Sequence, residues 1–245
     1  MKIAVLSDIH GNLAALEAVL GDAATRGADK MVNLGDIVSG GLHPRETADR
    51  LIPLGLPTIR GNHERQLLTL SYDRMSLSDR HAAGELRIDQ IEWLRSLPET
   101  LLLPGGVLMV HGTPASDLAY FLETVTRSGL RAATPAEVEE RARGADAALI
   151  LCGHTHVPRL VRLGDGRLIV NPGSVGLPAY ADDRPFPHVV ENGSPHARYA
   201  LVEQRGEAWS AELIAVDYEW EAAARDALGN GRADWAVALR TGRAG

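Results

Sequence analysis

The chain has 245 residues, of which 45% are hydrophobic and 23% charged, so it is long enough for one globular domain with a large buried core. Its formal net charge of −7 at pH 7 disfavours bulk, sequence-independent binding to nucleic acid. The single cysteine, Cys152, cannot form an internal disulfide. No apolar stretch approaches the roughly 20 residues that cross a bilayer, and the first strand-like run has no signal-peptide pattern. We therefore expect a cytoplasmic protein without a membrane anchor.

The first half of the chain alternates predicted strands and helices. Short apolar runs predict strands at 2–6, 30–34 and 57–59. A helix follows Asn12, which can cap it, and a second helix is predicted at 44–54. Such alternation predicts an α/β sheet. The next stretch is mainly helical, which we interpret as a helical insertion around 64–100 within a single domain spanning 1–245.

The second half predicts more strands and two hairpins. Buried strands are predicted at 107–110 and 148–151. Two hairpins follow, one with strands at 160–163 and 167–170 around Gly-Asp-Gly, the other with strands at 199–204 and 208–216 around Arg-Gly-Glu. The stretch 178–195 is rich in Pro, Asp, Gly and His and is interpreted as a long irregular loop. A last helix starts near Glu219, and the tail from about 229 is expected to fray.

Polar clusters rich in histidine follow five of the predicted strands. They are Asp8-Ile9-His10, Gly35-Asp36, Gly61-Asn62-His63-Glu64, His111-Gly112 and Gly153-His154-Thr155-His156. In an open α/β sheet, sites form outside the carboxyl ends of the strands, so we expect the five clusters to converge. Imidazole and carboxylate ligands together favour Mn, Fe, Zn, Co or Ni over Ca, which prefers oxygen ligands. The sequence therefore predicts a transition-metal site.

Each cluster taken alone has a structural alternative. Asp8 could cap a helix, Gly35-Asp36 is also an ordinary turn, and His111 could be a strand-end histidine with no ligand role. The combination favours the metal site, because five of the nine histidines of the chain fall in these clusters.

In this order, the clusters resemble the signature of the calcineurin-like metallophosphoesterases. That signature is Asp-x-His, Gly-Asp, Gly-Asn-His-Asp/Glu, a lone His and Gly-His-x-His, and every element is present between Asp8 and His156. The resemblance implies a four-layer αββα sandwich of two mixed β-sheets. It is closest to the small bacterial and archaeal phosphodiesterase-like members.

The resemblance also implies two divalent transition-metal ions, with Mn favoured among Mn, Fe, Zn, Co and Ni. One ion would be held by Asp8, His10, Asp36 and His156, and the other by Asp36, Asn62, His111 and His154, so that Asp36 bridges them. A metal-bridging hydroxide would attack phosphorus. His63 would act as the catalytic residue that protonates the leaving oxygen or positions the substrate. Glu64 either orients His63, lies directly behind the metal ligands, or only begins the next helix.

Other residues have weaker signals for substrate binding. Arg60 could reach a phosphate oxygen or pair with a nearby carboxylate, and Ser174 could support the site or belong to a plain turn. Four residues in or near the long loop could line a substrate entrance or form a solvated face: Arg184, His188, His196 and Arg198. Residues 118–122 could form a cap over the site, a dimer contact or ordinary core, so the oligomeric state stays open.

The expected activity is hydrolysis of a nucleotide-type or other small phosphodiester. Protein phosphatases and symmetrical dinucleotide tetraphosphatases carry an arginine at the position of Gly40, which argues against both activities here. The alternatives are a phosphomonoesterase, a protein or dinucleotide-polyphosphate phosphatase, and a non-catalytic scaffold of the same fold. A small phosphate ester is the expected partner.

Overall fold

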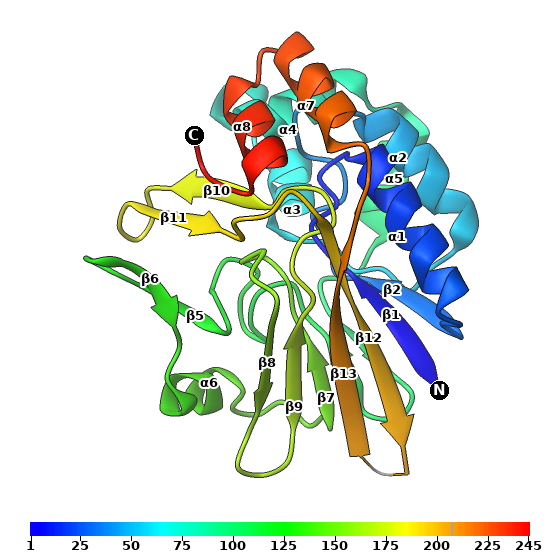
Figure 1. Cartoon of the computed structure of the whole chain (residues 1–245), viewed down its shortest axis with the longest axis vertical. Coiled ribbons are helices and arrows are strands. Elements are labelled where there is room, and N and C mark those ends of the chain that lie inside the picture. Colours follow the sequence, from blue (N-terminus) through cyan, green and yellow to red (C-terminus); the bar gives the residue numbers. More distant parts are fainter. Residues whose placement is uncertain (207) are drawn as a thin grey trace.

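A computed structural model of the protein describes residues 1–206 and 208–245. The first sheet has four strands in the order β13-β12-β1-β2 (Figure 1), with bounds β1 (Lys2–Leu6), β2 (Lys30–Asn33), β12 (Ala197–Arg205) and β13 (Ala208–Val216). β1 pairs parallel with β2 and antiparallel with β12. The sheet is therefore mixed, and the hairpin predicted at 199–216 is confirmed in the pairing of β12 with β13, while Glu207 of its turn lies outside the described residues.

The second sheet is also mixed and has five strands. Their order is β3-β4-β7-β9-β8, with bounds β3 (Leu101–Leu103), β4 (Val107–Met109), β7 (Leu149–Leu151), β8 (Arg159–Arg162) and β9 (Leu168–Asn171). The central strands β4, β7 and β9 run parallel, and β8 pairs antiparallel with β9 as the Gly-Asp-Gly turn predicts. Parallel strands put their carboxyl ends at one edge of the sheet.

The two sheets pack face to face through alternate side chains. Ile3 and Val5 of β1 join an apolar cluster with Met109 of the second sheet. The alternate residues Ala4 and Leu6 face the opposite way, toward the helices. Both faces of β1 are buried, which is why its sequence is a continuous apolar run rather than an alternating one.

Helices cover the outer face of each sheet. Helix α1 (Leu13–Thr25) packs on the first sheet through Leu16 and Val19, and α6 (Pro135–Arg141) packs on the second through Val138. The remaining helices are α2 (Pro44–Leu51), α3 (Asn62–Thr69), α4 (Leu77–Glu85), α5 (Ile88–Ser96), α7 (Trp220–Gly229) and α8 (Ala233–Thr241). The predicted α/β fold, an αββα arrangement of two mixed sheets flanked by helices, is confirmed.

Two small hairpins project beside the sheets (Figure 1). They are β5 (Glu123–Thr126) with β6 (Gly129–Ala132), and β10 (Ala179–Asp182) with β11 (His188–Glu191). The prediction of an irregular loop at 178–195 was therefore wrong. The alternation of buried His188 and Val190 with exposed Val189 and Glu191 is that of a half-buried strand, and the Pro and Asp residues of the turn obscured it.

Two other predicted segments differ in the structure. The strand at 57–59 is reduced to a single bridge between Asn33 and Thr58. The stretch from about 229 includes α8, whose Trp235 is only 5% exposed. The division of the chain into domains stays a prediction. Among the described residues, none of the helices combines the length and the apolarity that crossing a bilayer requires.

Candidate metal centre

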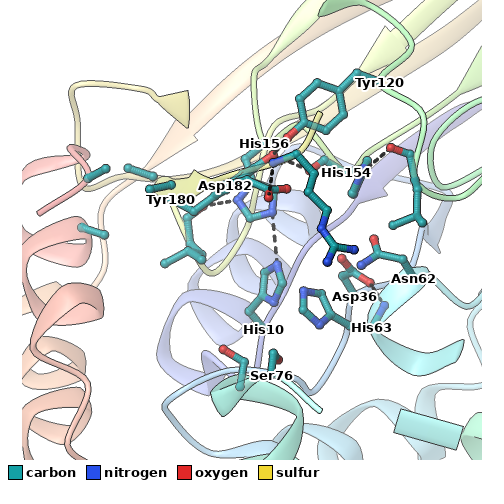
Figure 2. Close-up of a pocket in the computed structure, with 18 of the residues that line it drawn as sticks. His10, Asp36, Asn62, His63, Ser76, Tyr120, His154, His156, Tyr180 and Asp182 are labelled. Atoms are coloured by element: carbon teal, nitrogen blue, oxygen red, sulfur yellow. Dashed lines mark hydrogen bonds between the residues drawn. The ribbon is translucent and has the colours of Figure 1, made fainter. Parts of the chain in front are cut away.

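The predicted polar clusters lie at the edge where the carboxyl ends of strands from both sheets meet. Asp8 follows β1, Asp36 follows β2, His111 follows β4, and His154 and His156 follow β7. Asn62 and His63 begin α3, next to Asp36. Figure 2 shows the labelled side chains His10, Asp36, Asn62, His63, His154 and His156 around one pocket. The structure thus brings together residues that lie up to 148 positions apart, between Asp8 and His156.

Two groups of potential ligand atoms form in this pocket. The first contains Asp8, His10 and His156, and the second contains Asp36, His111 and His154; the ligand atoms of each group lie within 4.8 Å of one another. In the second group His111 Nε2 is 3.1 Å from Asp36 Oδ2 and 3.2 Å from Asn62 Oδ1. His111 Nε2 is also 4.0 Å from Asp8 Oδ1, so the two groups are adjacent.

Each of the four histidines in these groups turns one ring nitrogen to a backbone carbonyl. The Nδ1 atoms face carbonyl oxygens at 2.6 Å (His10 to Ser39), 2.8 Å (His111 to Leu34) and 2.7 Å (His156 to Leu177), and His154 Nε2 faces Leu118 O at 3.1 Å. A carbonyl only accepts, so these ring nitrogens donate. In His10 and His154, whose pKa burial lowers to about 4, the other ring nitrogen carries a lone pair, whereas Asp36 and Asp8 outweigh burial and raise the pKa of His111 to about 10. Metal-ligating histidines are oriented in this way.

A cation fits the first group because its lone pairs face one another. His10 Nε2 and His156 Nε2 lie 3.1 Å apart, although the second nitrogen of each ring already donates to a carbonyl. Asp8 Oδ1 lies 3.3 Å from His156 Nε2 and is buried without a hydrogen-bond partner among the described residues. Burial, with His156 next to it, lowers the pKa of His10 to about 4, so that ring is neutral at pH 7. A metal ion held by Asp8, His10 and His156 would satisfy all three atoms.

The backbone adopts the left-handed conformation at several of these ligand candidates. Five non-glycine residues in the described part of the chain have a positive φ: Asp8 (56°), His10 (52°), Asp36 (53°), His154 (68°) and His156 (57°). That conformation costs on the order of 1–3 kcal/mol per residue and persists where the surroundings enforce it, as at functional sites. All five belong to the two groups of ligand atoms.

Glycines in the motifs are needed because the ligands pass directly over them. A Cβ atom on Gly61 would lie 2.2 Å from Asp36 Oδ1 and 2.8 Å from His111 Cε1. A Cβ atom on Gly153 would lie 2.8 Å from Asp8 Oδ2. The glycines next to the ligands thus leave the space in which carboxylates from one sheet meet histidines from the other.

Glu64 holds two of the motif loops together. Its Oε2 accepts hydrogen bonds from the backbone N–H groups of Asp36 (2.8 Å) and Gly61 (2.9 Å), and its Oε1 accepts one from Ile37 (2.8 Å). Burial and the adjacent Asp36 raise the pKa of Glu64. Glu64 lies in the first turn of α3, and its hydrogen bonds run to the backbone of the Asp36 and Gly61 loops rather than to His63.

His63 is paired with a carboxylate that the motifs do not contain. His63 Nδ1 lies 2.7 Å from Asp79 Oδ1, and Ser76 Oγ donates to Asp79 Oδ2 at 2.8 Å. Burial lowers the pKa of His63, but Asp36 and Asp79 outweigh it and raise the pKa to about 9. The His63 side chain is 23% exposed and lines the pocket, so its remaining nitrogen is accessible to a substrate.

The pocket is a cavity of about 1050 Å³ with two aromatic walls. Trp235 of α8 lies against His10, with ring centroids 5.9 Å apart. Tyr120 lies against His154, with centroids 5.1 Å apart, and its hydroxyl meets that of Tyr180 at 2.7 Å. Residues 118–122, for which a cap, a dimer contact and core packing were considered, divide between roles: Tyr120 lines the cavity, whereas Phe121 and Leu122 are core.

The two predicted substrate-binding residues lie outside the lining of this cavity. Arg60 pairs with Glu99, with Nη2 2.7 Å from Oε1, which is the carboxylate alternative. The hydroxyl of Ser174 donates to Asp8 O (2.8 Å) and accepts from Leu177 N (2.8 Å). Ser174 thus supports the loops that carry Asp8 and the carbonyl partner of His156.

Of the four residues considered for a substrate entrance, Arg184 lines the cavity. His188 contacts the cavity wall from outside the cavity: its Nε2 lies 2.9 Å from the hydroxyl of Tyr120, which lines the cavity. His196 pairs with Asp217 at 2.9 Å, and Arg198 packs against Gly173. The last three are not part of the cavity lining.

Two mixed sheets flanked by helices, with two buried His/Asp groups at their common carboxyl edge, define a metal-dependent phosphoester hydrolase. The sequence model of the calcineurin-like phosphoesterase superfamily domain matches residues 1–190, and the chain belongs to that superfamily. The family prediction is confirmed.

Relatives match the chain over nearly its whole length. It is 27% identical to the uncharacterized protein MJ0912 of Methanocaldococcus jannaschii over 95% of this chain and 94% of that one. A crystal structure of a metallophosphoesterase from Sphaerobacter thermophilus is 25% identical, covers 98% of both chains and superposes with a TM-score of 0.74. The hypothetical protein PH1004 of Pyrococcus horikoshii, at 23% identity, 98% coverage of both chains and a TM-score of 0.77, shares the fold.

Proposed function

We propose that the protein is a phosphodiesterase that hydrolyses a nucleotide-type or other small phosphodiester with two divalent transition-metal ions, Mn being favoured. One ion is assigned to Asp8, His10, Asp36 and His156, and the other to Asp36, Asn62, His111 and His154. The two groups of ligand atoms and the lone pairs that converge in them support this assignment. Histidine and carboxylate donors suit Mn, Fe, Zn, Co and Ni alike, so availability decides between them.

The observation that carries the diester assignment is the placement of the two walls. The Trp235 wall borders His10 of the first group, and the Tyr120 wall borders His154 of the second. A phosphoryl group placed between the two groups of ligand atoms therefore has open space on its Trp235 side and on its Tyr120 side. A diester has two substituents on phosphorus to fill such a cavity, whereas a monoester has one.

The position of Gly40 supports the same assignment. A Cβ atom there would lie 2.2 Å from His10 O and 2.6 Å from the Trp235 ring, so this backbone has no room for the arginine that protein phosphatases carry. A monoester dianion needs more neutralising charge than a diester monoanion. The Asp36 motif loop of this chain supplies no such charge.

Bound metal ions would activate water and stabilise charge on the phosphoryl oxygens. Around them, the protein holds each ligand ring through a backbone carbonyl, and Glu64 holds the Asp36 and Gly61 loops together. His63 faces the cavity with Nδ1 fixed by Asp79, so its Nε2 side is placed to give a proton to the leaving oxygen.

A side-by-side assay tests this proposal. The protein is stripped of metal, resupplied with Mn, Ni, Co, Zn or Mg, and assayed with bis(p-nitrophenyl) phosphate and p-nitrophenyl phosphate. The expected result is metal-dependent hydrolysis with a higher kcat/KM for the diester. Hydrolysis of the monoester much faster than the diester would contradict the diester assignment while keeping the phosphoesterase.

A further inference from the structure

Among the described residues, three arginines line the cavity, and the guanidinium groups of two of them are already hydrogen-bonded to other protein groups. Arg141 donates to the carbonyls of Phe121 (2.9 Å) and Glu123 (2.8 Å) and to Thr124 Oγ1 (2.8 Å). Arg232 donates to both carboxylate oxygens of Asp234 and to Ser78 Oγ (2.8 Å). Their guanidinium groups are structural, because their donors already have fixed partners.

Arg184 differs from both. Within the described part of the chain, its guanidinium group makes no hydrogen bond and no ion pair, and the residue is exposed to the cavity. Asp182, two residues earlier, accepts from the backbone N–H of Arg184 at 3.0 Å, and within the described part of the chain neither Asp182 nor the adjacent Asp183 forms an ion pair with the guanidinium. A full set of guanidinium donors therefore faces the cavity without a protein acceptor.

The hairpin that carries Arg184 is anchored on the metal centre. Tyr180 of β10 packs its ring on His156, with centroids 4.7 Å apart, and its hydroxyl donates to His154 O at 3.3 Å. Arg184 lies four positions further on, in the turn between β10 and β11. The turn is therefore held above the histidines of the Gly-His-x-His motif, and Figure 2 shows Tyr180 and Asp182 beside His156.

We propose that Arg184 binds a non-bridging oxygen of the substrate's phosphoryl group, which rests on the proposed phosphoesterase function. The planar guanidinium fork matches the spacing of two phosphoryl oxygens and stays charged at any working pH. Gly40 leaves no room for an arginine in the Asp36 loop, and Arg184 of the β10–β11 turn supplies a cation to the cavity instead. Arg184 is therefore a substrate-binding residue outside all the motifs.

Binding of inorganic phosphate to the Mn-loaded full-length protein tests the proposal directly. Isothermal titration calorimetry is compared between wild type, Arg184→Ala, Arg184→Lys and the control Arg127→Ala. Arg127 packs on the same turn, 5.5 Å from the Phe186 ring, but does not line the cavity. We expect Arg184→Ala to weaken phosphate binding about 10- to 100-fold, as for loss of charge-assisted hydrogen bonds. The phosphate affinity of Arg184→Lys should lie between those of wild type and Arg184→Ala, and the affinity of Arg127→Ala should match that of wild type.

Kinetics with bis(p-nitrophenyl) phosphate give a second readout. Arg184→Ala should lose a similar factor in kcat/KM at unchanged metal content, and added guanidinium ion should restore part of it in Arg184→Ala alone. Equal phosphate affinity in Arg184→Ala and wild type would overturn the proposal, whatever the kinetics. If wild type hydrolyses no ester, the phosphoesterase function fails, but phosphate affinity still decides the role of Arg184.

Discussion

His63 Nδ1 and Asp79 Oδ1 lie 2.7 Å apart, although the two residues belong to different helices, α3 and α4. The carboxylate holds Nδ1 of His63 and therefore leaves Nε2 facing the cavity. Asp79 is itself held by Ser76, which donates to it through its hydroxyl and caps α4. The helical segment after the Asn62 motif thus supplies a positioning residue for the proposed proton donor.

Asp79→Asn is expected to lower kcat at least about 10-fold. The loss should stay below the roughly 10²- to 10⁴-fold that a general acid contributes, because Asp79 only positions His63. The loss should grow as the leaving alcohol becomes less acidic, because the expected role of His63 is to protonate the leaving oxygen. The measurement is kcat for a series of aryl and alkyl phosphodiesters, with metal content checked by mass spectrometry. The control is Asp73→Asn, an exposed carboxylate just before α4. An equal loss for every leaving group would assign Asp79 a purely structural role.

Glu64→Gln is expected to destabilise the protein by about 1–3 kcal/mol, because an amide cannot accept all three backbone hydrogen bonds that the carboxylate accepts. Chemical denaturation of the metal-free protein measures the free energy of unfolding. The control is Glu99→Gln, since the Glu99 side chain is 71% exposed and should change stability by less than about 0.5 kcal/mol. Equal stability of both variants would show that Glu64 does not hold the loops.

Gly61→Ala is expected to lower kcat/KM at least about 100-fold and to reduce bound metal. The added methyl group would overlap Asp36 Oδ1 and press on His111, and displacing a reacting group by about 1 Å costs this much. Metal content and hydrolysis are measured together. Gly21→Ala is the matched control, since nothing lies within 4 Å of that position on α1. Wild-type metal content in Gly61→Ala would contradict the crowding argument.

The convergence of the motifs was predictable because four of the five follow a strand, and strand ends determine where sites form. The buried strands β1, β4 and β7 are continuous apolar runs that can be read without a partner. The hairpin β10–β11 was missed because the Pro and Asp residues of its turn outweigh a short alternating strand.

The residues that complete the site were not predictable in the same way. Asp79 lies 16 positions after His63 with no motif around it, and only the packing of α4 on α3 brings them together. From the sequence, Arg184 is only a loop residue that could line an entrance. That its guanidinium makes no hydrogen bond or ion pair with the described residues is a property of the folded chain. The ring nitrogen that each histidine offers depends on which carbonyl its other nitrogen meets, as for His154, whose Nε2 faces Leu118 O.

The most direct test of the dinuclear centre is the number of metal ions bound per chain, measured together with activity. Wild type and Asp36→Asn are stripped of metal, equilibrated with Mn, and analysed by inductively coupled plasma mass spectrometry and bis(p-nitrophenyl) phosphate hydrolysis. A dinuclear centre predicts two ions per chain and hydrolysis in wild type, with fewer ions and little hydrolysis in Asp36→Asn. Hydrolysis by fully stripped wild type, or two ions and full activity in Asp36→Asn, would contradict it.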